Sequence, residues 1–249
     1  MEVKRDYYLS KLIESKRNGL VKIITGIRRC GKSFLLFTLF RDYLLKSGVK
    51  EDHIIQLDFD VIENKKYRDP EVAFNYVNSK IIDKDEYYVL FDEVQLLGDF
   101  ESVLNSFLKR ENVDVYATGS NSHMLSSDIA TEFRGRSWQI HVYPFSYKEF
   151  KDAHPTYESD KAFDEYVTYG GMPYLLNLVN ETDKVTYLTN LFNETYLKDI
   201  IERNHLRANN SLRNIINVLC SSEGSLSNPH KISDTFRSTS DKSISETTV

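Results

Sequence analysis

Over the first 145 residues of the chain, segments with a strand-like pattern of apolar residues alternate with segments that have helical apolar spacing. Short apolar runs rich in β-branched and aromatic residues, such as LVKIIT at 20–25, predict strands. Stretches with apolar residues three and four positions apart, such as Leu9, Leu12 and Ile13, predict helices. The predicted strands are 20–25, 53–59, 86–91, 113–118 and 137–142, and the predicted helices are 6–17, 33–46, 70–82 and 100–109. Because strands that alternate with helices need crossover connections, we expect an α/β protein with a mostly parallel sheet covered on both faces.

The strand pattern fades near residue 145, and helical spacing continues alone. We therefore expect a domain over 1–145, a helical region over 146–207 and a third segment over 208–249. The helices predicted after the change are 147–151, 162–168, 173–179 and 184–203.

The last segment supports two interpretations. Thirteen of the 29 residues in 221–249 are Ser or Thr, a composition typical of a flexible tail. Alternatively, helical spacing at 212–220 and 231–236, with a new start at Ser245, fits the first half of a helix-turn-helix. Both interpretations stay open at this point.

Composition excludes several classes of protein. Only two cysteines occur, Cys30 and Cys220, so no disulfide framework is expected. No apolar stretch approaches the ~18 residues of a membrane span, and the charged start is unlike a signal peptide. We therefore expect a cytoplasmic protein without a membrane partner. The six histidines show no ligand spacing, so a metal site built by protein groups alone is not expected.

Charge is distributed unevenly along the chain. The net charge is −5, yet residues 1–50 hold 12 basic and 4 acidic residues, a local net charge of +8. This excess is either a solvated face or a surface that meets an anion. The motif that follows favours nucleotide phosphate as that anion.

The segment GIRRCGKS at 26–33 fits the phosphate-loop pattern G-x-x-x-x-G-K-[ST]. It follows a predicted strand and opens a predicted helix, so backbone N–H groups and the helix N-terminus would converge on phosphate oxygens. Lys32 would reach the β- and γ-phosphates, and the Ser33 hydroxyl would bind Mg²⁺. The predicted nucleotide-binding residues are Gly26, Ile27, Arg28, Arg29, Cys30, Gly31, Lys32, Ser33 and Phe34.

Two carboxylates, Asp92 and Glu93, directly follow the predicted strand 86–91. Ligands of α/β sheets bind at the carboxyl ends of strands, so both would lie near the phosphate loop. Asp92 would hold Mg²⁺ beside Ser33, and Glu93 would polarise the attacking water.

Polar residues also follow the fourth predicted strand. Ser120 and Asn121 would either sense the γ-phosphate and orient water or simply cap the next helix. Arg134 and Arg136 come shortly after, and the guanidinium group suits a developing phosphoryl charge. Surface charge is the alternative for both arginines.

The chain resembles the widespread prokaryotic AAA-type ATP-binding proteins, in which an AAA domain precedes a C-terminal domain of unknown function. The resemblance rests on the ordered segments GIRRCGKSFLL, YYVLFDEVQLL, YATGSNSHML, FRGRSWQIHVYPFSYKEF and YVTYGGMPYLL. It implies a P-loop NTPase fold with sheet order 5-1-4-3-2, a helical lid that contains 166–173, and a winged helix after it. It also implies that Ser120 and Asn121 lie near the γ-phosphate. It further implies that Arg136, or alternatively Arg134, acts on a neighbouring subunit's nucleotide.

Members of that family continue well beyond residue 249, so we expect this chain to be a truncated form with an incomplete winged helix. The leading hypothesis is Mg²⁺-dependent binding and hydrolysis of ATP, coupled to a conformational change, in a protein that forms homo-oligomers or serves an unknown protein partner. The alternatives are an ATP-binding switch or interaction module without hydrolysis, and a regulator that binds DNA through its C-terminal helices. The net negative charge counts against DNA.

Overall fold

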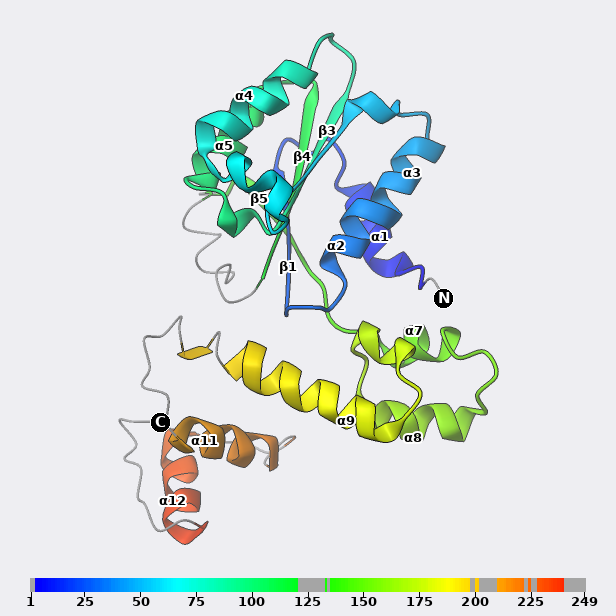
Figure 1. The fold of residues 1–249 in the computed structure, drawn as a ribbon, viewed down its shortest axis with the longest axis vertical. Helices are drawn as coiled ribbons and strands as arrows, with labels where there is room; N and C mark the ends of the chain where they lie inside the picture. Colours follow the sequence, from blue (N-terminus) through cyan, green and yellow to red (C-terminus); the bar gives the residue numbers. More distant parts are fainter. Residues whose placement is uncertain are drawn as a thin grey trace. The chain divides into compact units, whose positions relative to one another are not determined.

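The computed structural model describes residues 3–120, 133, 135–197, 200–201, 210–221, 224 and 228–239. Five strands form one parallel sheet in the order β2-β3-β4-β1-β5 (Figure 1). This order confirms the fold that the family resemblance implies. The strands are β1 (Val21–Gly26), β2 (Ile54–Asp58), β3 (Tyr87–Asp92), β4 (Val113–Ser120) and β5 (Ser137–His141).

Helices cover both faces of the sheet, as the alternating pattern predicts (Figure 1). Successive residues of β1 point to opposite faces of the sheet. Ile23 packs into the core on the side of α4 and α5, and Ile24 packs into the core on the side of α1, α2 and α3. Both isoleucines are fully buried. The helices are α1 (Asp6–Glu14), α2 (Lys32–Phe34) with π-type turns at Leu35–Phe40, α3 (Arg41–Lys46), α4 (Pro70–Lys80) and α5 (Phe100–Phe107).

The chain is helical without a break from Lys32 to Lys46, as predicted for 33–46, but its middle turns are of π type. Three 3-10 turns, Glu51–His53, Ile62–Arg68 and Val94–Leu96, were not predicted. Such turns carry too few residues to show a period in the sequence.

Helices after β5 form the rest of the first of two compact units, which are Met1–Asn190 and Leu191–Val249. A reciprocal capping box starts α7: the Ser146 hydroxyl accepts from the Glu149 N–H, and the Glu149 carboxylate accepts from the Ser146 N–H. The domain boundaries expected at 145 and 207 stay predictions. The elements are α7 (Tyr147–Asp152), α8 (Ser159–Tyr169), a 3-10 turn at Pro173–Asn177 and α9 (Glu181–Asn190).

The motif that the resemblance places in the helical lid packs against the connection between β5 and α7. The Tyr166 hydroxyl donates to the Phe145 carbonyl oxygen at 2.9 Å, and the Phe145 N–H donates to the Gly171 carbonyl oxygen at 2.7 Å. A Cβ on Gly171 would lie 2.1 Å from the Phe145 carbonyl oxygen, so only glycine permits this approach.

The second unit contains π-type turns at Leu191–Leu197 followed by α11 (Asn210–Ser221) and α12 (Pro229–Thr239). Ile232 of α12 packs on Ile215 and Val218 of α11. The described residues 229–239 are thus helical and bury an apolar side chain, and the flexible-tail interpretation of 221–249 stays a prediction. The winged helix stays a prediction, since Ser245 and the rest of 240–249 lie outside the described residues. None of the helices in the described part of the chain is long and apolar enough to cross a membrane.

A buried ion pair joins the two central strands. Lys22 of β1 is fully buried and pairs with Asp114 of β4. The Asp114 carboxylate also accepts from the Tyr116 hydroxyl at 3.0 Å and from the Arg17 N–H at 2.9 Å. Burial lowers the pKa of Lys22, and the charge of Asp114 opposes that shift. The carboxylate therefore keeps a buried lysine tolerable near the amino end of a strand inside a parallel sheet.

Replacing Asp114 with Ala should lower the free energy of unfolding by about 3–5 kcal/mol, because Lys22 would be left buried without a counter-charge. The double variant Lys22→Met/Asp114→Leu removes both charges and should recover most of that loss. Urea unfolding of both variants and of the wild type measures the difference. A loss below about 1 kcal/mol in the single variant would show that water reaches Lys22.

Candidate functional site

The loop 26–33 connects β1 to the long helix and requires three unusual backbone conformations. The φ angles are +153° at Gly26, +65° at Arg29 and +100° at Gly31. A Cβ on Gly26 would lie 2.3 Å from the Val142 carbonyl oxygen, so glycine is required there for space as well as for backbone angle. The loop thus turns tightly over the carboxyl ends of β1 and β5, as the motif predicts.

The side chain of Lys32, near the end of this loop, turns back onto the loop backbone. Its ammonium group donates to the carbonyl oxygens of Gly26 and Ile27 at 3.1 Å each, and only 4% of the residue is exposed. The loop therefore holds a cation at the first turn of a helix, where the helix dipole also favours an anion.

Asp92 ends β3 beside the loop and is 97% buried, with 3% of its surface exposed. Its carboxylate accepts hydrogen bonds from the hydroxyls of Thr118 and Ser33. Burial raises the pKa of Asp92 to about 6, while these two bonds act in the opposite direction. The predicted pair of Mg²⁺ ligands, Ser33 and Asp92, is therefore in direct contact.

Glu93 follows in the left-handed region, with φ +51°. Its N–H donates to the Thr118 hydroxyl oxygen at 3.1 Å, which fixes the backbone next to Asp92. Its carboxylate accepts a hydrogen bond from the side-chain amide of Gln95. Glu93 thus lies at the predicted edge of the sheet, with its carboxylate occupied by a neighbouring side chain.

The structure describes two of the four remaining predicted site residues, Ser120 and Arg136. The backbone of Ser120 pairs with Gly26, which places it at the phosphate loop. Asn121 and Arg134 lie outside the described residues. Arg136 precedes β5, and its carbonyl oxygen accepts from the Val21 N–H at 3.0 Å, so it lies at the amino edge of the sheet. Five residues of β5 at about 3.3 Å each separate it from the phosphate-loop edge by roughly 16 Å.

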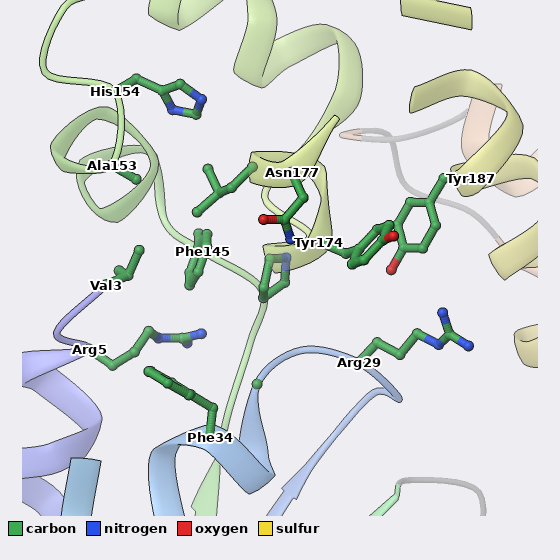
Figure 2. A pocket seen from close by; sticks show the side chains of 13 residues that line it. Val3, Arg5, Arg29, Phe34, Phe145, Ala153, His154, Tyr174, Asn177 and Tyr187 are labelled. Carbon is green, nitrogen blue, oxygen red and sulfur yellow. The ribbon is translucent and has the colours of Figure 1, made fainter. Parts of the chain in front are cut away.

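A cavity of about 620 Å³ adjoins the loop and is also lined by residues that follow β5 (Figure 2). Aromatic side chains from several elements line it, and the Tyr187 hydroxyl is buried there without a hydrogen-bond partner among the described residues. The Asn177 side-chain amide also faces the cavity (Figure 2). The lining includes Arg29, Phe34, Phe145, Tyr174, Asn177 and Tyr187.

Of these lining residues, sequence reasoning found Arg29 and Phe34 but missed those beyond residue 145. Tyr174, Asn177 and Tyr187 reach the loop only through the fold, and their spacing carries no chemical signature. His141 was also missed. Its imidazole shares a hydrogen bond of 3.0 Å with the Thr25 hydroxyl, and burial, together with the charge of Lys32, lowers its pKa. A neutral imidazole therefore lies beside the loop.

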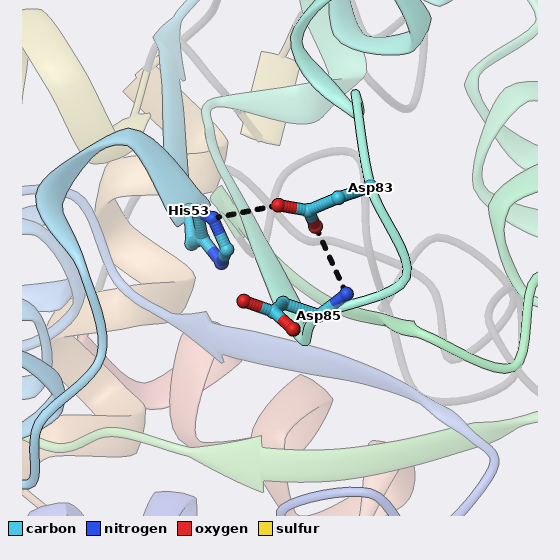
Figure 3. A group of neighbouring side chains, drawn as sticks. All are labelled: His53, Asp83 and Asp85. Carbon is cyan, nitrogen blue, oxygen red and sulfur yellow. Dashed lines mark hydrogen bonds and ion pairs between the residues drawn. The ribbon is translucent and has the colours of Figure 1, made fainter.

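One group of potential metal ligands lies apart from the loop: His53, Asp83 and Asp85 (Figure 3). The buried His53 ring is fixed by a contact of its Nδ1 with the Glu86 carbonyl oxygen at 3.2 Å and by stacking on Tyr87. Both aspartates are exposed, and the Lys50 ammonium already lies 3.1 Å from Asp85. The cluster is thus explained as a surface ion-pair group that includes a lysine.

Comparisons with known proteins agree with the geometry of the loop. Residues 18–151 match the family model described as an AAA domain, and residues 160–249 match a domain of unknown function, DUF8612. The first match spans more than half of the chain. The chain belongs to the AAA domain family. This membership confirms the resemblance drawn from the ordered motifs and indicates nucleotide binding.

Two curated relatives share the sequence over most of this chain. An uncharacterised protein of Haemophilus influenzae is 34% identical over 241 residues, which are 95% of this chain and 60% of the relative. An uncharacterised protein of Methanocaldococcus jannaschii is 26% identical over 224 residues, which are 84% of this chain and 47% of the relative. The chain thus spans about half to three fifths of the length of these relatives.

Solved structures give weaker likenesses. AMPPCP-bound DnaA from Aquifex aeolicus is 15% identical, with a TM-score of 0.40 over 88% of this chain and 68% of that one. PCH-2 of C. elegans is 18% identical, with a TM-score of 0.41 over 60% of this chain and 44% of that one. Both scores lie below 0.5.

Replacing Asp92 with Asn should stabilise the nucleotide-free protein near neutral pH, because the amide removes a buried charge. The folded pKa of about 6 lies above the ordinary value of 3.8. The folded state therefore binds more protons between these values, and stability falls as the pH rises through this window. The gain in the variant should be full above about pH 6 and shrink toward pH 4. Thermal midpoints at several pH values measure it.

The exposed Asp60 gives a matched control, since Asp60→Asn removes a carboxylate nearby without relieving burial. It should leave the pH dependence unchanged. An Asp92→Asn variant that is less stable than the wild type at every pH would contradict the assignment of a buried, costly charge.

Proposed function

We propose that this protein binds ATP with Mg²⁺ at the carboxyl edge of its sheet and hydrolyses it. The observation that carries the proposal is the buried Asp92 carboxylate, which accepts from the hydroxyls of Thr118 and Ser33 next to the loop that holds the Lys32 ammonium. A carboxylate that costs free energy to bury is typical of a functional site. Its neighbours are those that a metal-bound triphosphate needs.

The phosphates would lie in the loop 26–33, where N–H groups, the start of the helix and Lys32 all favour negative charge. The base would enter the adjacent cavity, whose volume of about 620 Å³ and aromatic lining suit a purine. The unpartnered Tyr187 hydroxyl and the Asn177 amide supply polar groups for its edge. This pose uses both the charged and the apolar sides of the site.

The donor set fits Mg²⁺, because Ser33 and Asp92 offer hard oxygen ligands at one point. When bound, the ion would neutralise phosphate charge. Ser33 and Asp92 would hold it, and Thr118 would keep the Asp92 carboxylate oriented through the hydrogen bond it already donates. Deprotonation of Asp92, whose pKa is about 6, makes this binding depend on pH.

Glu93 would accept a proton from the attacking water. It must first leave the Gln95 amide, which donates a hydrogen bond to its carboxylate. The same contact is the specific observation that favours the alternative, an ATP-binding switch without hydrolysis. In that case Gln95 would hold Glu93 in both states, and nucleotide would only change the conformation.

Arg136 can serve hydrolysis only on a neighbouring molecule, because β5 separates it from its own loop. We therefore propose a homo-oligomer in which the guanidinium of one subunit reaches the phosphates of the next. An unknown protein partner would receive the resulting conformational change. DNA binding remains a less favoured role for the C-terminal helices.

Replacing Glu93 with Gln should leave ATP binding intact and lower the hydrolysis rate by about a hundredfold or more, because the amide cannot accept a proton. Lys32→Ala is the matched contrast and should abolish both binding and hydrolysis. Binding of a fluorescent ATP analogue and release of inorganic phosphate measure the two effects. ATP binding without hydrolysis in the wild type would favour the switch, whereas full binding by Lys32→Ala would overturn the site.

The intersubunit role of Arg136 predicts that activity per subunit rises with protein concentration, because assembly completes the site. Arg136→Ala subunits lack the arginine but keep Glu93, and Glu93→Gln subunits have the opposite defect. Each variant alone should be nearly inactive, and a mixture should recover activity. Specific activity that stays constant on dilution, with no recovery in the mixture, would make Arg136 a structural residue.

A further inference from the structure

Arg5 is a buried arginine at the start of the chain, before the residues that match the AAA family model. Only 3% of it is exposed, whereas the preceding Lys4 is exposed. It adopts a left-handed backbone conformation, with φ +50°, directly before α1. Arginine is seldom fully buried unless its charge and donors are satisfied. Its partners therefore indicate why it is there.

The guanidinium group joins three segments that are far apart in sequence. One terminal nitrogen donates to the Cys30 carbonyl oxygen at 3.1 Å, and the other donates to the Tyr143 carbonyl oxygen at 2.7 Å. The Nε atom forms an ion pair with Glu149 at 2.9 Å. The rings of Tyr8 and Phe145 lie against the guanidinium, at 4.6 and 5.1 Å from its carbon. The first of these partners belongs to the phosphate loop.

The contact with Cys30 constrains a peptide group that faces the phosphates. The peptide group concerned is Cys30–Gly31, and the phosphates are part of the proposed function. In a trans peptide the C=O and N–H bonds point in opposite directions. Since the Cys30 carbonyl is held toward Arg5, the N–H of Gly31 points away from it. Gly31 is the second glycine of the motif and has φ +100°, so little in its own backbone would keep this peptide from turning over.

Glu149 ties the same guanidinium to the lid. Its Oε1 faces Arg5, while its Oε2 accepts from the N–H and hydroxyl of Ser146 in the capping box of α7. One carboxylate therefore fixes the start of α7 and compensates the charge beneath the loop. The phosphate loop and α7 are thereby connected through two side chains.

We propose that Arg5 is a positioning residue for the nucleotide phosphates: it clamps the Cys30–Gly31 peptide so that the Gly31 N–H stays turned into the loop, and Glu149 anchors this clamp to α7. The inference rests on the proposed binding of ATP at this loop. Arg5 itself does not contact phosphate. Its two terminal nitrogens donate to backbone carbonyl oxygens and its charge is paired with Glu149, which leaves the Gly31 N–H to act on the ligand.

The test compares nucleotide affinity in Arg5→Gln, Lys4→Gln and the wild type. Both variants lose one positive charge from the same segment, but only the first loses the clamp. Arg5→Gln should bind ATP and inorganic pyrophosphate each about tenfold or more weakly, the cost of a lost charged hydrogen bond in the loop. Lys4→Gln should bind both like the wild type. Binding is measured well below the thermal midpoint of each protein.

Glu149→Gln provides a second variant that does not depend on the folding of Arg5→Gln. Glutamine can preserve the capping box, but it removes the charge that holds the guanidinium. It should weaken binding of both ligands severalfold, and its effect should not add to that of Arg5→Gln in the double variant.

The outcomes separate this inference from the proposed function. If the wild type binds neither ATP nor pyrophosphate, the proposed function fails and this inference fails with it. If the wild type binds both and Arg5→Gln binds both equally well, Arg5 is only structural and the inference alone is wrong. Weaker binding of ATP with unchanged binding of pyrophosphate also overturns it, because Arg5 would then act through the base cavity.

Discussion

The buried negative charge of Asp92 is the constraint on which the rest of the site depends. A carboxylate with 3% exposure lowers stability unless something compensates it, and the two hydroxyls of Thr118 and Ser33 do so only in part, since its pKa is still raised to about 6. The sheet makes the arrangement stable enough to persist. Two apolar cores, one on each face, hold β1, β3 and β4 in register, so their polar ends must meet at one edge. The two apolar cores thus provide the stability that the buried charge at the carboxyl edge of the sheet reduces.

The charged side chains at the two edges of the sheet differ in their partners. At the amino edge, Lys22 and Asp114 neutralise each other within hydrogen-bonding contact, and the polar groups around them are satisfied. At the carboxyl edge, the Lys32 ammonium donates to backbone carbonyl oxygens, and the Asp92 carboxylate accepts from hydroxyls. Among the described residues neither has a direct counter-charge, which suits the proposed binding of a ligand that carries phosphate and a divalent cation.

The sequence predicted the layers well, because continuous apolar runs such as 86–91 and the phosphate-loop motif depend on local pattern alone. The strand order was accessible only through the family resemblance. Pairings between distant residues left no local trace: Lys22 looks like an ordinary polar position in LVKIIT until Asp114 is seen 92 residues away. Arg5 likewise resembles its exposed neighbour Lys4, and only the fold shows that it lies beneath the loop. Tyr187 was missed for the same reason.

We propose that Ser33 and Asp92 complete a metal-dependent nucleotide site. Calorimetric titration of the wild-type chain with a non-hydrolysable ATP analogue, once with Mg²⁺ and once with a chelator, measures whether they do. We expect one site per chain and an affinity at least about tenfold higher with Mg²⁺, a difference that disappears in Ser33→Ala. Absence of binding, or equal affinity with and without the metal in the wild type, would contradict it.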